Sequence, residues 1–155
     1  MEPRKSLVVA LGNPLVGADG FGAAVLERLR QLPGLGAIAD LFDAHTDLLG
    51  QLDRLVPYQR VVLIDTIVSA ESSGVRLYHE KHFAGWPDAS PGCHQFSPLV
   101  AVKLLRQLHP GAVPEMVLVG WSVEEVASTG GIPDDAVEDG TRLIADLLGV
   151  PAGRP

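Results

Sequence analysis

Two aspartates and a histidine stand where a folded chain can bring side chains together for metal chemistry. Asp19 follows an apolar run and a glycine-rich stretch, Asp65 closes a second apolar run, and His94 precedes a helix-like segment. Carboxylate oxygens and an imidazole nitrogen suit a borderline divalent cation such as zinc or nickel. The sequence contains no HExxH, CxxC or EF-hand spacing, so such a metal site depends on the fold.

Simpler roles for the same residues remain open. Asp19 can cap the helix that follows it, because Asp accepts hydrogen bonds from the free amides of a first turn. Asp65 can start a turn, and His94 can be an ordinary loop histidine. The stretch "GNPLVGADGFG" suggests a phosphate cradle, but it lacks a P-loop lysine, and its glycines do not have the dinucleotide-binding spacing.

Composition narrows the function classes. A formal charge of −7 opposes binding to nucleic-acid phosphates, and the apolar run before Gly12 is too short for a signal-peptide core or a membrane span. Cys93 is the single cysteine and favours a reducing compartment, so we expect the protein in the cytoplasm. We also expect a monomer with no nucleic-acid or membrane partner. No GxSxG elbow is present, and Cys93 beside His94 is weak support for nucleophilic catalysis.

Strand and helix patterns alternate along the chain. Branched-aliphatic runs predict strands at residues 7–11, 60–65 and 115–120, with weaker strands at 38–44 and 74–80. Helical spacing of apolar residues predicts helices with the following positions on one face: Phe21, Val25, Leu29 and Leu32; Phe96, Leu99, Val100, Leu104 and Leu108; Val137, Ile144 and Leu148. The last helix is expected to start near Pro133 and stop at Gly149.

This order predicts an α/β fold: a three-layer sandwich with a mostly parallel five-stranded sheet, one antiparallel strand, and helices on both faces. The turn before residue 74 is too short for a parallel crossover, so the strand after it is expected to return antiparallel beside its neighbour. Residues 1–150 are expected to form a single domain and residues 151–155 a frayed tail. Ligands of such sheets bind at the carboxyl ends of the strands, where Asp19, Asp65 and His94 would converge.

Four segments, in this order, resemble the hydrogenase maturation endopeptidases, which trim the C-terminal extension from the large subunit of [NiFe] hydrogenase. They are "LGNPLVGADGFG", "VVLIDTIVSAESSGV", "HQFSPLVAVKLL" and "VLVGWSVEEV". Carried over by position, the family's metal ligands fall on Asp19, Asp65 and His94. The family often has a second acid where this chain has Ala18, which leaves Asp19 as the carboxylate of that segment.

The resemblance implies an endopeptidase that recognises nickel already inserted in the large-subunit precursor. The nickel then arrives with the substrate, and the isolated protein can be free of metal. The nickel, or water on it, would polarise the scissile carbonyl while a carboxylate, Asp19 or Asp65, assists proton transfer. The hydrogenase that is processed and the cleavage site are not readable from the sequence.

A second departure concerns the family's DGGT-like turn, which reads "DAHT" here. Asp43 and Thr46 match, whereas Ala44 and His45 replace the glycines. The resemblance implies that Asp43 and Thr46 bind the substrate tail, and we expect His45, in the same turn, to bind it with them. His45 is alternatively an extra ligand, a base, or a residue that shapes the loop.

Two other functions compete. "LGNP" also resembles the opening of peptidyl-tRNA hydrolase, but the Tyr and catalytic His of that family are missing from the following stretch, and the acidic charge opposes tRNA. The other alternative is a non-catalytic module that binds a nucleotide or a metalloprotein.

Overall fold

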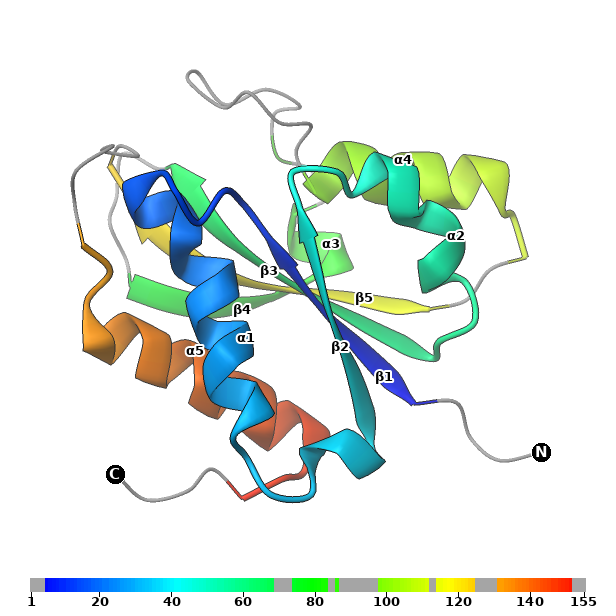
Figure 1. Cartoon of the computed structure of the whole chain (residues 1–155). Helices are drawn as coiled ribbons and strands as arrows, with labels where there is room; N and C mark the ends of the chain where they lie inside the picture. The colour runs from blue at the N-terminus through cyan, green and yellow to red at the C-terminus, as the bar shows by residue number, and fades with distance from the viewer. Residues whose placement is uncertain are drawn as a thin grey trace.

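A five-stranded sheet forms the middle layer of the molecule (Figure 1). The structure is a computed structural model that describes residues 5–68, 74–83, 86, 98–111, 114–124 and 131–151. The strands lie in the order β2-β1-β3-β5-β4. Their bounds are β1 Ser6–Leu11, β2 Ala39–His45, β3 Arg60–Val68, β4 Gly74–His79 and β5 Glu115–Val123. β4 is antiparallel to β5, and the other pairings are parallel, as the sequence predicts.

Helices cover both faces of the sheet. In Figure 1, α1 (Phe21–Arg30) and α5 (Asp134–Leu148) lie together on one face, while α2 (Leu52–Leu55), α3 (Glu80–Phe83) and α4 (Pro98–Leu108) lie on the other. Three short 3-10 helices are also described: η1 Gly17–Gly20, η2 Leu35–Ala37 and η3 Leu49–Gln51. The predicted three-layer α/β sandwich is confirmed.

The apolar runs of the sequence are strands buried on both faces. Val8 and Ala10 of β1 pack with α1 and α5, whereas Leu7, Val9 and Leu11 pack with the helices of the opposite face. Successive side chains of a strand point to opposite faces, so a strand covered on both sides is apolar throughout. This burial fixes the carboxyl ends of β1 and β3, where the candidate site lies.

The partner expected for β4 was wrong. β4 follows β3 in the chain, but β5 lies between them and pairs with both. The burial patterns give the physical reason: most of β5 is buried, whereas β4 alternates between exposed and half-buried residues. The apolar strand therefore takes the interior position and the more polar strand the edge.

Helix ends follow the local sequence signals. α5 begins after Pro133 and stops at Gly149, which has a φ of +73°, in agreement with the prediction. α4 is described from Pro98, so a start near Phe96 and the frayed tail beyond residue 151 lie outside the described residues. Among the described helices, none has the length and apolar character that crossing a bilayer requires.

Candidate functional site

Asp19 and Asp65 lie together at the carboxyl edge of the sheet. Asp19 belongs to η1, directly after the loop that leaves β1, and Asp65 lies near the end of β3. Both residues are half-buried. They are close enough for the charge of Asp19 to act on the carboxyl of Asp65. The parallel pairing of β1 with β3 thus joins two acids that are far apart in sequence.

Burial raises the pKa of the Asp65 carboxyl to about 7. The Thr66 backbone N–H donates to Asp65 Oδ1 over 2.8 Å and opposes this rise, while the negative charge of Asp19 adds to it. Desolvation and a neighbouring like charge both disfavour the ionised carboxylate. A divalent cation would remove both penalties, so this pair suits a metal.

Asp19 is held by the loop before it. Its Oδ2 accepts a hydrogen bond from the Asn13 backbone N–H at 2.7 Å, and its own N–H donates to the Val16 carbonyl at 2.8 Å. The alternative role of Asp19 as a cap of the following helix is not what the structure has, because α1 begins at Phe21 after Gly20, with no side-chain hydrogen bond at its N-cap. The carboxylate instead closes the loop that starts at Gly12, whose φ is +109°.

Two contacts fix the start of α1 on the sheet. The Thr66 hydroxyl donates to the carbonyl of Ala18 at 2.7 Å, which ties β3 to the residue before Asp19. A side chain at Gly22 would have its Cβ 2.6 Å from the Leu11 carbonyl oxygen and 2.9 Å from that of Ile64. The glycine-rich stretch therefore packs helix against strands, and the Asn13 N–H that a phosphate cradle would use binds Asp19.

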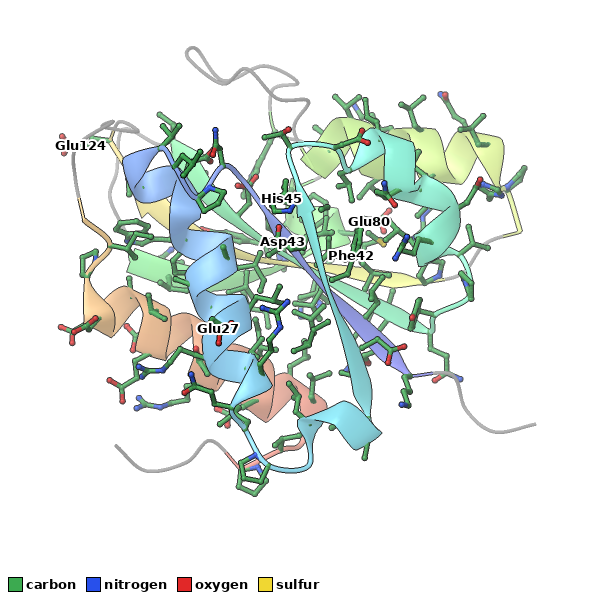
Figure 2. All side chains as sticks on the ribbon, viewed as in Figure 1. Glu27, Phe42, Asp43, His45, Glu80 and Glu124 are labelled. Carbon is green, nitrogen blue, oxygen red and sulfur yellow. The ribbon has the colours of Figure 1, made fainter. Side chains whose placement is uncertain are left out.

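Asp43 and His45 end the neighbouring strand β2. The His45 N–H donates to Asp43 Oδ1 at 2.9 Å, and the same oxygen lies 3.4 Å from His45 Nδ1. Figure 2 shows the two side chains at the upper end of β2. The His45 carbonyl accepts the Gly12 N–H at 2.7 Å, so the β2 exit adjoins the Asp19 loop. Thr46 is exposed.

His94, the third residue predicted as a ligand, lies outside the described residues, as does Cys93. Within the described ranges, no three His, Cys, Asp or Glu side chains are grouped so that they could hold a metal ion. The described part of the site thus supplies two carboxylates of the expected donor set.

A depression of about 420 Å³ lies elsewhere, near the amino ends of the parallel strands, and is lined by His79, Glu80, Lys81, Glu115 and Met116. His79 Nδ1 lies 3.9 Å from a carboxylate oxygen of Glu115, and Glu115 also accepts a 2.9 Å hydrogen bond from Arg60 Nε. Glu115 thus pairs with His79 and Arg60 at a place remote from Asp19 and Asp65.

Sequence reasoning missed three supporting residues: Asn13, Thr66 and Gly22. The Asn-Pro pair at residues 13 and 14 is a turn signal, and the Asn13 side chain accepts the Leu15 N–H at 2.9 Å. Thr66 directly follows Asp65, but nothing in the sequence indicates that its hydroxyl reaches Ala18. Gly22 is required because the strands leave no space for a side chain, not because of an unusual φ, so its role can be seen only in the folded structure.

Replacing Gly12 by alanine should destabilise the protein more than the same replacement at a positive-φ glycine that has free space around it. A Cβ at residue 12 would collide with the Asp19 carbonyl oxygen and lie 3.0 Å from its Oδ1, in addition to the strain at a φ of +109°. We expect Gly12→Ala to lower the free energy of unfolding by roughly 3 to 5 kcal/mol. Denaturant unfolding measures the change.

Gly34→Ala is the matched control for this substitution. Gly34 also has a positive φ, +84°, but a Cβ there would have no atom within 4 Å. It should cost only about 1 kcal/mol, from the backbone alone. Equal losses in the two variants would show that the contact with Asp19 is unimportant.

Solved structures of hydrogenase maturation proteases share this architecture, although no protein-family model and no curated protein sequence matches the chain. The hydrogenase maturating endopeptidase HybD from E. coli aligns with a TM-score of 0.75 and 21% identity, over 94% of this chain and 92% of that protein. The [NiFe] hydrogenase maturation protease HybD from Thermococcus kodakarensis gives 0.69 and 20%, over 93% and 99%. The protease HycI from the same organism gives 0.69 and 17%, over 94% and 93%. The chain therefore has the fold of the hydrogenase maturation endopeptidases.

Proposed function

We propose that this protein is an endopeptidase that removes the C-terminal extension from a nickel-loaded [NiFe] hydrogenase large-subunit precursor. The observation that carries the proposal is the pairing of Asp19 with Asp65 at the carboxyl edge of this fold. The names of the structurally similar proteins support the protease activity. One cysteine in the whole chain fits a reducing compartment, so we place the reaction in the cytoplasm, with a monomeric enzyme.

In this proposal Asp19, Asp65 and His94 recognise nickel that the precursor already carries. The binding site is composite, because the precursor supplies the remaining ligands and the ion itself. Such a site binds the loaded precursor better than the empty one, since much of the affinity comes from ligands meeting the metal. Recognition of the metal therefore delays cleavage until nickel is in place.

Peptide hydrolysis at this site needs a polarised carbonyl and a group that accepts a proton from water. The nickel of the substrate polarises the scissile carbonyl, and one of the two carboxylates takes the proton. Asp65 is half-buried beside Asp19, where exclusion of water strengthens electrostatic interactions with the reacting groups. The loop through Gly12 and Asn13 keeps Asp19 in place before the substrate arrives.

Nickel-loaded and nickel-free precursors, incubated separately with the purified protein, test this function. We expect the loaded precursor alone to be shortened, which mass spectrometry of the large subunit detects. Cleavage of both precursors at equal rates would leave a protease without metal recognition. Failure to cleave the loaded precursor would refute the proposed function.

A further inference from the structure

We propose that His45, paired with Asp43, donates the proton that the leaving amine requires when the peptide bond breaks. This inference rests on the proposed function and adds a catalytic residue to it. The two carboxylates account for accepting a proton from water, but they leave the departing nitrogen without an assigned donor. Histidine is the residue that most often transfers protons in enzymes.

The backbone conformation of His45 is unusual for a residue with an exposed side chain. Its φ is +53°, and it is the one non-glycine residue with a positive φ in the described ranges. This conformation costs stability that glycine would not lose. The side chain is 64% exposed, so burial does not offset that cost. Strain of this kind tends to persist at functional sites.

Asp43 lies beside the imidazole and attracts its charged form. Its Oδ1 accepts the His45 backbone N–H at 2.9 Å and lies 3.4 Å from Nδ1 of the ring. The carboxylate therefore favours a proton on Nδ1 and leaves Nε2 on the side of the ring away from Asp43. Figure 2 shows this pair at the end of β2. When both ring nitrogens carry a proton, Nε2 is the one that donates away from Asp43.

The β2 exit is also joined to the paired acids. The register of β1 with β2 shifts here, so that Leu11 pairs with His45 after Ala10 pairs with Asp43. This irregularity lets the His45 carbonyl accept the Gly12 N–H at 2.7 Å. Gly12 in turn lies against Asp19. The backbone of His45 is thus joined through Gly12 to the loop that holds Asp19.

The other described histidines are placed elsewhere. His79 and His82 lie where β4 ends beside the start of β5, at the opposite edge of the sheet, and the His82 ring accepts the His79 N–H. His109 follows α4 and lies 3.0 Å from an Asp53 carboxylate oxygen. Of the histidines that the structure describes, His45 is the one at the edge that holds Asp19 and Asp65.

The proton and electron balance of the step is simple. The oxygen of water bonds to the scissile carbonyl carbon, and one water proton passes to a site carboxylate. The C–N bond then breaks with its electron pair on nitrogen, which takes the proton from Nε2 of the protonated ring. The products are a new carboxyl terminus and the free amine of the tail. Solvent returns a proton to His45 and removes one from the carboxyl group.

Two variants of His45 separate this role from a structural one. Asparagine tolerates a positive φ but carries no transferable proton, so we expect His45→Asn to lower kcat for the loaded precursor about 100-fold, with little change in KM. His45→Gly should lose activity equally while its Tm rises by about 2 to 4 °C, because the backbone cost disappears. Added imidazole should restore part of the turnover of the glycine variant.

His109→Asn is the matched control, because it removes a histidine remote from the site and should keep the wild-type kcat. Wild-type turnover in His45→Asn, or a change confined to KM, would overturn the inference and leave the proposed protease intact. A wild-type protein that never cleaves the loaded precursor would overturn both.

Discussion

Asp19→Ala is expected to abolish processing of the nickel-loaded precursor while leaving the protein folded. Loss of a group that merely supports a metal ligand lowers metal affinity or activity about 10- to 100-fold. Loss of a ligand itself should lower activity by at least about 100-fold, the upper end of that range. The variant loses the acceptor of the 2.7 Å Asn13 hydrogen bond, so the free energy of unfolding should fall by about 1 kcal/mol. Mass spectrometry of the large subunit and thermal unfolding measure the two effects.

Asp19→Asn distinguishes the charge from the hydrogen bond. Its amide oxygen can still accept the Asn13 N–H, so stability should stay near that of the wild type while processing is lost. Glu27→Gln removes an exposed carboxylate from α1, where it pairs with Arg30 at 3.1 Å, and should process normally. An Asp19→Ala protein that trims the precursor at the normal rate would eliminate Asp19 as a ligand.

Asp65→Asn should change how stability depends on pH in the metal-free protein. The pKa of this carboxyl is about 7 in the folded state against an ordinary value of 3.8, so the folded state binds the proton more tightly. The stabilisation is fully present below about pH 4 and is lost as pH rises through about 7. The loss amounts to at most about 4 kcal/mol of unfolding free energy.

Asparagine does not titrate, and its amide oxygen can still accept the Thr66 N–H. The Asp65→Asn variant should therefore gain stability relative to wild type as pH rises from 4 to 8, as measured by urea unfolding at each pH. It should also lose processing. Asp139→Asn changes an exposed residue of α5, and its free energy of unfolding should depend on pH as that of the wild type does. A constant difference between Asp65→Asn and wild type across this range would contradict the raised pKa of Asp65.

Apolar runs in the sequence predicted the sheet, because a strand that is buried on both faces needs apolar residues throughout. Residues 7–11 and 60–65 read as apolar runs since both faces of β1 and β3 are covered. Both strands of the β1–β3 pair run parallel, so their carboxyl ends had to meet at one edge, which brought Asp19 and Asp65 together. The place of His94 in the site stays a prediction.

Features that depend on long-range contacts were not readable. A turn before β4 indicates that the chain reverses, but it does not reveal that a later strand pairs between β3 and β4. Asp19 before a helix looks like a cap, yet the nearer Asn13 amide takes its carboxylate because Gly12 turns the loop back.

The environment of single side chains was also beyond sequence patterns. Nothing in "LIDT" shows that Asp65 is desolvated enough to raise its pKa, because burial depends on η1 lying over the strand end. His45 likewise looks like any polar residue after a strand. Its positive φ occurs together with the Asp43 hydrogen bond and the register shift beside Gly12, which are features of the fold.

The interior position of β5, between β3 and the edge strand β4, also determines the order in which the chain can fold. β3 and β4 are consecutive in sequence, yet they cannot remain paired as a hairpin, because residues 115–123 must lie between them. During synthesis the apolar edge of β3 has no native partner until β5 is made. Exposed strand edges of this kind promote aggregation of partly folded chains. A nascent chain that stops before β5 therefore presents the edge carrying Asp65 to solvent, which makes completion of the last strand the step that protects the site.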